Sequence, residues 1–277
     1  MDLRCRIVAI AVLTTIMAVP VFAANKVEPG FQGVGGKFGE VYECAFPNSV
    51  KLDGDLEDFA WQLAGWHFVD NKTGTGPAPN EADASISFAA VADDKWLYVA
   101  IRVKDDKIVR GEEPPGSSWK DDSVKIYIDP NHGETAAYET KNGNWDSQIT
   151  IPADNIGKDP KKPDLGGTGD GATTGTEVVV VETAEGWDVE AAIPLSSKGK
   201  WDINPTDGMV IGFNIHLNDD DDGGDRDHKL IWSKKDVDDR SWTDTTRFAD
   251  LQFVNLQLSV DVKGKLTTQW ARMKANQ

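Results

Sequence analysis

Cysteine is almost absent from this chain of 277 residues, which contains only Cys5 and Cys44. Because Cys5 lies in a segment that we expect to be removed, Cys44 has no partner and an internal disulfide is excluded. The sequence has no CxxC pair and no His/Cys spacing typical of a metal site. Cys44 is therefore expected to be a small buried apolar residue and not a nucleophile.

Signatures of nucleophilic catalysis are also missing. There is no G-x-S-x-G motif, and the four histidines have no obvious serine or cysteine partner. One of them, His216, falls on the polar side of a predicted strand, as is typical of a surface or pocket group. A pair of carboxylates that cleaves a glycoside is defined by its spatial separation, which the sequence does not give. A glycoside hydrolase therefore stays open as an alternative.

Positive charge is scarce, since 29 Lys and Arg stand against 46 Asp and Glu and give a formal net charge of −17. Such a chain repels phosphate backbones and anionic lipid surfaces. We therefore expect neither a nucleic acid nor a membrane as a partner. Neutral sugars and cations such as calcium are compatible with this charge.

Long apolar runs are lacking except near the beginning of the chain. Arg4 and Arg6 precede the apolar residues 7–19, and a small-residue pattern typical of signal cleavage ends at Ala23. We expect residues 1–23 to be a signal peptide and the mature protein to be soluble and secreted or periplasmic. The run is too short for a membrane span, and no later stretch approaches the necessary length.

Helical periodicity is rare in the rest of the chain, whereas apolar and polar residues alternate repeatedly. The clearest cases are 97–103, 124–128 and 209–217, and turn-forming residues separate them at short intervals. The pattern predicts an all-β fold, an antiparallel β-sandwich of the immunoglobulin or jelly-roll type, and disfavours a doubly wound α/β fold. Its core is expected to contain Val124, Ile126, Ile128, Leu97, Val99, Ile101, Ile211, Phe213 and Ile215.

Composition divides the mature chain into three parts. Residues 24–40 are glycine-rich and polar and are expected to form an arm or linker. Residues 41–262 form the predicted sandwich domain, and 263–277 a short tail. Within the domain, Asp55 is expected to cap a short helical turn, and 256–262 to form the last strand.

The acidic loop 218–227, NDDDDGGDRD, is the first candidate for a metal site. Asn218, Asp220 and Asp222 fall at positions 1, 3 and 5 of an EF-hand-like register. Position 12 requires a glutamate but is Lys229, so a true EF-hand is excluded. Clustered carboxylates beside a glycine still suit the oxygen-only shell of calcium, and the alternative is a solvated acidic loop.

A second candidate is the segment LDGDLED, 52–58, in which Asp53 and Asp55 flank the glycine of a predicted turn. Carboxylates presented by a turn suit calcium for the same reason. We therefore expect calcium as a structural cofactor at one or both of these segments.

Tryptophan is abundant, with ten residues in the chain. Four lie within apolar patterns and are expected in the core: Trp61, Trp96, Trp187 and Trp232. Three lie in the polar segments SSWKDD, GNWDSQ and RSWTDT: Trp119, Trp145 and Trp242. An exposed indole needs something to cover it, and sugar rings have C–H faces that stack on indole while polar neighbours bind the hydroxyls. The alternative is that Trp119 or Trp242 packs in the core.

Six segments occur in a definite order along the chain: VKLDGDLEDFAW, DDKWLYVAIRVKDD, SSWKDDSVKIYID, GWDVEAAIP, IGFNIHLNDDD and SWTDTTRFADLQF. In this order they resemble the family 9 carbohydrate-binding modules, which are found appended to xylanases and in stand-alone secreted proteins. The resemblance covers about residues 49–253. It implies a jelly-roll-like β-sandwich, structural calcium ions, and a slot in which two tryptophans clamp the reducing-end sugar of a glycan.

Matched motif by motif, the resemblance assigns the two slot tryptophans to Trp119 and Trp242. The family often has an acid where this chain has Lys125, so an acceptor of sugar hydroxyl protons is replaced by a donor. Trp145 and Gln148, in the variable loop, are the further candidates for contacts with the sugar. The resemblance thus implies a monomeric, secreted, non-catalytic protein that binds polysaccharide or oligosaccharide ends, as of xylan or cellulose, and supports polysaccharide breakdown.

A haem-binding electron-transfer domain is a further alternative, because related sandwiches hold b-type haem. Its axial ligands would be a methionine with a lysine or histidine. The predicted mature chain has only Met209 and Met273, and no C-x-x-C-H motif. Met209 falls on the apolar face of its predicted strand, which disfavours this alternative.

Overall fold

The computed structural model describes residues 36–256 apart from residue 142. The predicted signal peptide, most of the predicted arm, the last predicted strand beyond Leu256 and the tail lie outside the described residues. In the described part of the chain, no helix is long and apolar enough to cross a membrane.

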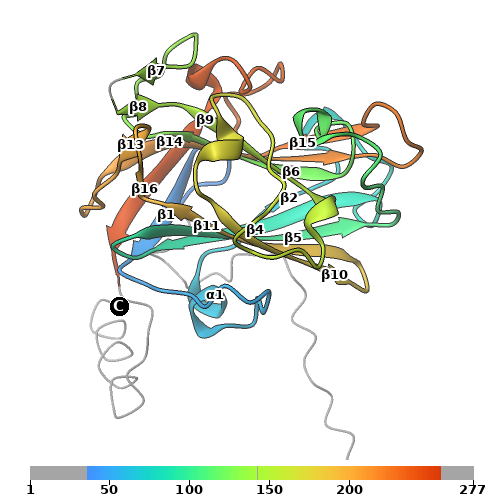
Figure 1. Ribbon diagram of the computed structural model, residues 1–277, viewed down its shortest axis with the longest axis horizontal. Helices are drawn as coiled ribbons and strands as arrows, with labels where there is room; N and C mark the ends of the chain where they lie inside the picture. Colours follow the sequence, from blue (N-terminus) through green and yellow to red (C-terminus); the bar gives the residue numbers. More distant parts are fainter. Residues whose placement is uncertain (1–35, 142, 257–277) are drawn as a thin grey trace, which may run out of the picture.

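Two packed layers of strands make up the fold, and both belong to one 12-stranded sheet that folds back on itself (Figure 1). One layer contains β10 (Glu177–Thr183), β11 (Gly186–Pro194), β5 (Trp96–Asp105) and β4 (Ala84–Ala92), with β2 (His67–Val69) paired to β4. The other contains β16 (Ala249–Asn255), β14 (Val210–Asp219), β6 (Ser123–Asp129) and β9 (Ser147–Pro152), extended by β15 (His228–Ile231) and β3 (Gly74–Gly76).

Strand β1 (Val41–Phe46) joins the two layers, because it pairs with β4 on one edge and with β16 on the other. Both pairings are parallel, whereas the neighbouring pairs β4–β5 and β14–β16 are antiparallel. The predicted β-sandwich is confirmed, with β1 as a departure from a purely antiparallel pattern. A parallel pair needs a long connection, and β1 and β16 lie at opposite ends of the domain sequence.

Short elements complete the described fold. A small separate sheet contains β12 (Ser196–Ser197), β13 (Trp201–Asp202), β8 (Asn144–Trp145) and β7 (Thr140–Lys141). The helices are α1 (Phe59–Leu63) and the 3₁₀ turns η1 (Pro115–Ser117), η2 (Ala153–Asn155), η3 (Gly171–Thr173) and η4 (Thr245–Arg247).

The main hydrophobic core lies between the two layers. Alternate residues of the strands point into it, which follows from the two-residue period of a strand. All nine predicted core residues are buried there. Ile126 on β6 pairs with Ile215 on β14, and Phe213 on β14 pairs with Ile128 on β6. Trp187 and Trp232 join this core as predicted.

A second apolar cluster covers the outer face of the layer that contains β4, β5 and β11. Trp61, from α1, is buried in it, and Trp96 packs against it partly buried. In Figure 1, α1 lies on the side of this layer that faces away from the other one. The predicted helical turn is therefore confirmed, but its N-cap is Asp58 and not Asp55. Asp55 instead accepts a hydrogen bond from the backbone of Glu57 at 3.0 Å.

The outer face of the other layer is polar although it is buried. On β6, the residues between the inward apolar ones are Ser123, Lys125, Tyr127 and Asp129, and all four are buried. Matching positions of β14 and β9 are polar too: Asn214, His216, Asn218, Gln148 and Thr150. A buried polar face needs hydrogen-bond partners, so this face is the part of the fold best suited to a site for a polar ligand.

Candidate functional site

Trp119 and Trp242 are the two exposed tryptophans of the described chain, with 37% and 50% of their surface accessible. Trp119 follows η1 and stands just before β6, and Trp242 lies in the turn before η4. Their exposure shows that neither ring is in the core, so the alternative that Trp119 or Trp242 packs there is wrong. Large exposed indoles on a folded surface are typical of contact sites.

A chain of charged contacts connects the two tryptophan loops. The guanidinium carbon of Arg226 lies 5.2 Å from the centre of the Trp119 ring, a cation–π geometry. The same guanidinium donates from Nη2 to Asp239 Oδ2 at 3.0 Å, and Asp239 lies three residues before Trp242. Lys229 also donates to Asp239 from β15. Arg226 and Asp239 therefore link the Trp119 loop to the Trp242 loop.

Lys125 lies at the centre of the polar face, on β6, and only 4% of its surface is accessible. Its direct strand neighbours are Thr150 on β9 and His216 on β14, and neither is an acid. In the described chain, Lys125 forms no ion pair with a carboxylate within 4.0 Å. Burial, followed by the charges of Lys229 and Arg226, holds the pKa of the Lys125 ammonium well below its usual value.

His216 is completely buried and belongs to a hydrogen-bonded network that supports the Trp242 loop. Its Nδ1 lies 3.1 Å from the Tyr127 hydroxyl, and its Nε2 lies 3.4 Å from Asp236 Oδ2. Burial lowers the pKa of His216 to about 3, so the imidazole is neutral at pH 7. Asp236 in turn accepts from the backbone nitrogens of Arg240 at 2.7 Å and Ser241 at 3.1 Å.

Further hydrogen bonds hold the turn that carries Trp242. Asn214 donates from Nδ2 to Ser241 Oγ at 3.0 Å, and the Tyr138 hydroxyl donates to the Ser241 carbonyl oxygen at 2.6 Å. The turn is thus tied to β14 and to the segment after β6. Because the turn is fixed on both sides, the Trp242 ring is presented by a preorganised backbone.

Gln148 lies on the same polar face, opposite Tyr127 on β6. Its Nε2 donates to Thr150 Oγ1 at 2.9 Å, whereas its Oε1 is buried and has no hydrogen-bond partner among the described residues. A buried acceptor without a partner costs free energy unless a ligand or water satisfies it. Gln148 therefore supplies a free acceptor on the same face as Lys125, which has no carboxylate partner.

Trp145 is placed differently from the other candidates. It lies in β8 of the small sheet, and its Nε1 donates to the Gly169 carbonyl oxygen at 2.9 Å. The Lys200 ammonium lies 4.6 Å from the centre of its ring. The indole also packs against the main core, so both its polar atom and one ring face are already in use.

The strongest metal candidate is a group of three buried carboxylates, Asp105, Asp122 and Asp219. They come from the ends of β5 and β14 and from the residue before β6, and one oxygen of each lies within 4.8 Å of the others. Burial, with the repulsion between them, raises the pKa of Asp122 and that of Asp219 to about 9. Asp219 Oδ2 is buried without a hydrogen-bond partner in the described structure.

Such a set fits a calcium ion, which takes oxygen ligands and offsets the repulsion between carboxylates. These three acids do not stand out in the sequence as a metal-binding motif. Each of them lies at or next to one end of a strand in which apolar and polar residues alternate. These strand ends are far apart in the sequence, and only the topology of the sheet brings them together.

The predicted acidic loop forms a neighbouring group, and the other predicted segment does not. Asp220 and Asp222 lie together with Asp227, and Asp220 Oδ2 is buried without a partner in the described chain. Asp53 and Asp55 belong to no such group among the residues that the structure describes. Both are exposed, and their carboxylates accept hydrogen bonds from the backbone within their own turn.

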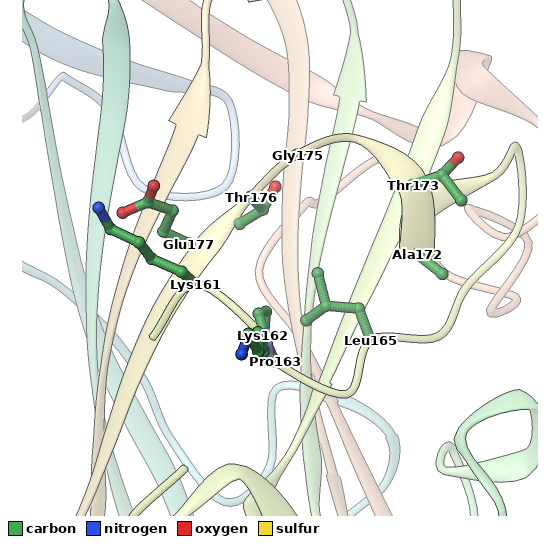
Figure 2. A pocket seen from close by; sticks show the side chains of 9 residues that line it. All are labelled: Lys161, Lys162, Pro163, Leu165, Ala172, Thr173, Gly175, Thr176 and Glu177. Carbon is green, nitrogen blue, oxygen red and sulfur yellow. The ribbon is translucent and has the colours of Figure 1, made fainter. Parts of the chain in front are cut away.

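Two further features of the described structure lie apart from the tryptophans. Figure 2 shows a pocket with Lys161 and Glu177 toward one end and Thr173 at the other. No aromatic residue lines it, and none of the predicted site residues does. Met209, the methionine considered as a haem ligand, packs against the core, and Met273 lies outside the described residues.

Known proteins are similar to this chain in sequence and in fold. The profile of a family described as carbohydrate family 9 binding domain-like matches residues 52–256. Endo-1,4-beta-xylanase A of Thermotoga maritima is 31% identical over 206 residues, which are 73% of this chain and 17% of that enzyme. Exoglucanase XynX of Acetivibrio thermocellus is 29% identical over 200 residues, 72% of this chain and 16% of the enzyme. The chain therefore spans about a sixth of the length of these relatives.

The fold is also similar to a solved structure. A carbohydrate-binding module of family 9 from Caldicellulosiruptor kristjanssonii, in complex with cellotriose, superimposes with a TM-score of 0.61 at 21% identity. The match covers 81% of this chain and 100% of that module. At this identity the likeness concerns the fold alone.

Proposed function

The chain belongs to the carbohydrate family 9 binding domain-like family, and from that membership we propose that it is a non-catalytic protein that binds the ends of polysaccharides or oligosaccharides. The relatives are xylanases and an exoglucanase, and the solved module holds cellotriose. Their names support β-linked glucose or xylose chains as ligands and a role in the breakdown of plant-type polysaccharides. We propose that the protein acts as a monomer, in a secreted or periplasmic location.

One observation carries the proposal: two exposed indoles, Trp119 and Trp242, lie beside a buried polar face that contains a donor without a carboxylate within 4.0 Å and an acceptor without a partner among the described residues. The donor is Lys125 and the acceptor is Gln148 Oε1. Sugar rings combine apolar C–H faces with hydroxyls that both donate and accept, so they match this combination. A surface for an apolar partner would not need the polar face.

The energetics agree with a weak-to-moderate binder. Each indole that covers a few tens of Å² of sugar surface contributes on the order of 1 kcal/mol at about 25 cal/mol per Å². Two rings alone therefore give millimolar affinity or weaker, because a Kd of about 1 mM corresponds to about 4 kcal/mol. Hydrogen bonds from the polar face must supply the rest and must select the sugar.

We also propose a structural calcium ion at Asp105, Asp122 and Asp219, with Asp220 and Asp222 as candidates for a neighbouring ion. The support is the geometry of the buried carboxylates and their unpartnered oxygens. Calcium there would tie β5, β6 and β14 together just behind the Trp119 loop. Its role would be to hold the loop in place and not to contact the sugar.

The test of the binding function is a titration of Trp119→Ala and Trp242→Ala with cello- and xylo-oligosaccharides. We expect each variant to fold and to lose roughly fivefold to tenfold in affinity, because one stacking face is worth on the order of 1 kcal/mol. Phe59→Ala is the matched control, since Phe59 is also an exposed aromatic, on α1 of the other layer. Binding by both tryptophan variants at the parent's affinity would refute the proposed slot.

A separate measurement addresses catalysis. We expect no release of reducing sugar from xylan or cellulose by the purified protein. Sustained release that disappears in a carboxylate variant would instead support the hydrolase alternative.

A further inference from the structure

Basic side chains gather near the proposed slot although the chain as a whole is acidic. The formal net charge is −17, yet three cations, Lys125, Lys229 and Arg226, gather around the single carboxylate of Asp239. Arg226 and Lys229 each contact that carboxylate, and Lys125 lies beside Lys229. A cluster of like charges inside an acidic protein is unfavourable unless something anionic compensates it.

The nearby acid Asp236 favours the charged form of Lys229, but it forms no ion pair within 4.0 Å with any of the three cations. Its oxygens contact His216 and accept from the backbone of Arg240 and Ser241. The strand neighbours of Lys125 are Thr150 and the neutral His216, so neither carries a negative charge. Among the described residues, Asp239 is therefore the one acid that forms an ion pair within 4.0 Å with any of the three cations.

Of the three cations, Lys125 is the one that forms no ion pair with a carboxylate among the described residues. It is 4% accessible, and an ammonium in such a place loses most of its hydration without gaining an ion pair. The lowered pKa of Lys125 is the physical sign of this cost. An incoming carboxylate would supply the missing partner and restore the charged form of the ammonium.

The cations also lie at the right place for a ligand held by the indoles. Arg226 lies over the Trp119 ring at 5.2 Å, and its partner Asp239 is on the Trp242 turn. A sugar ring against Trp119 therefore has its substituents close to Arg226. Gln148 Oε1, the buried acceptor on the same face, remains available for a hydroxyl.

Resting on the proposed function, we propose that the slot selects a sugar that carries a carboxylate, a uronic acid, through Lys125, Lys229 and Arg226. Guanidinium and ammonium groups bind carboxylates through charge-assisted hydrogen bonds, which are stronger than hydrogen bonds to a neutral hydroxyl. The sugar ring stacks on indole in the same way as that of a neutral sugar. The carboxylate decides the preference, and the ligand class is an acidic oligosaccharide end.

The test compares three ligands by calorimetric titration at low salt: glucuronic acid, its methyl ester and glucose. The ester keeps the shape of the acid but carries no charge. We expect the parent protein to bind the acid roughly tenfold or more tightly than the ester, since a charge-assisted hydrogen bond is worth about 1.5–3 kcal/mol. We expect this difference to shrink as salt is raised, because screening weakens partly exposed ion pairs.

Two variants locate the effect. Lys125→Met keeps the approximate length of the side chain and removes its charge. Arg226→Gln also removes a charge, and because the Arg226 side chain is partly exposed, this substitution should disturb folding less. Each should lose most of the preference for the acid, so that the ratio of the affinities for the acid and for the ester falls toward one, whatever change each variant makes to the affinity for the ester and for glucose. Lys200→Met is the matched control, because Lys200 is also a buried lysine beside an indole, that of Trp145, and should keep the preference.

The outcomes separate this inference from the proposed function. If the parent binds glucose or the ester as tightly as the acid, sugar binding stands and the acidic preference is wrong. If both Lys125→Met and Arg226→Gln still prefer the acid over the ester, the preference does not come from these two residues and the inference is wrong. If none of the sugars binds, and the oligosaccharides do not bind either, the proposed function fails together with the inference.

Discussion

The indole Nε1 of Trp61 donates a hydrogen bond of 2.7 Å to Oε1 of Glu190, a buried carboxylate at the centre of β11. The second oxygen of Glu190 accepts from the backbone nitrogens of Asp53 at 2.9 Å and Gly54 at 2.6 Å. One carboxylate thus holds both the turn 53–54 and α1 against the outer face of the sandwich. The acidic turn that we expected to bind calcium is fixed by hydrogen bonds to a neighbouring strand.

The first prediction concerns this carboxylate. Glu190→Gln replaces an acceptor that has two oxygens by an amide that has one, so at least one of the three donors loses its partner. We expect the free energy of unfolding to fall by about 1–3 kcal/mol, as measured by urea denaturation. Glu182→Gln is the control, since Glu182 is exposed on β10 and should change stability little. Equal stability of the Glu190 variant and the parent would contradict the structural role.

The second prediction concerns the core between the layers. Ile126 is completely buried on β6, and truncation to alanine removes apolar contacts and leaves a cavity. We expect Ile126→Ala to lower the free energy of unfolding by about 2–5 kcal/mol. Val181→Ala, at a valine that is 38% accessible, should cost much less. Similar losses for the two variants would show that β6 is not in the register described.

The third prediction concerns calcium. In metal-stripped protein, free calcium at about 100 times its Kd should stabilise the fold by about 2.7 kcal/mol, seen as a rise in Tm. Asp219→Asn should abolish this rise, and should also stabilise the metal-free protein because one buried repulsive carboxylate is removed. Asp53→Asn should keep the rise. A parent Tm that calcium and chelator leave unchanged would refute the site.

The fourth prediction concerns pH and Asp188, on β11 next to Arg102. Burial raises the pKa of Asp188 to about 6 in the folded protein, above the ordinary value of 3.8. Between these values the folded state holds a proton that the unfolded state has lost, so this group's stabilisation is present below about pH 4 and is lost as pH rises to about 6. The expected loss is on the order of 1–3 kcal/mol.

Asp188→Asn should remove that component from the dependence of stability on pH. The measurement is the free energy of unfolding of both proteins at several pH values from 4 to 7. If the difference between parent and variant stays constant over this range, Asp188 is not protonated in the folded protein at pH 4–6.

The sequence by itself determined the two layers of the sandwich and the residues of its core. Alternation with a period of two decides which side of a strand is apolar, and this is a local property, so Leu97, Ile126 and Phe213 were placed correctly without knowledge of the topology. The polar surroundings of Trp119 and Trp242 similarly predicted their exposure. Family membership followed from motifs that the sequence carries in order.

The tertiary structure decided which polar residues meet. Asp105, Asp122 and Asp219 are far apart in the chain and come together only because β5, β6 and β14 end at the same place. The acids at 53–55 look similar in the sequence, yet their own turn and Glu190 satisfy the local hydrogen bonds. Likewise, the burial of Lys125 beside Lys229 and Arg226 depends on strand order and loop packing. Electrostatic energy depends on distances in space, and these distances are set by the topology and not by the local sequence pattern.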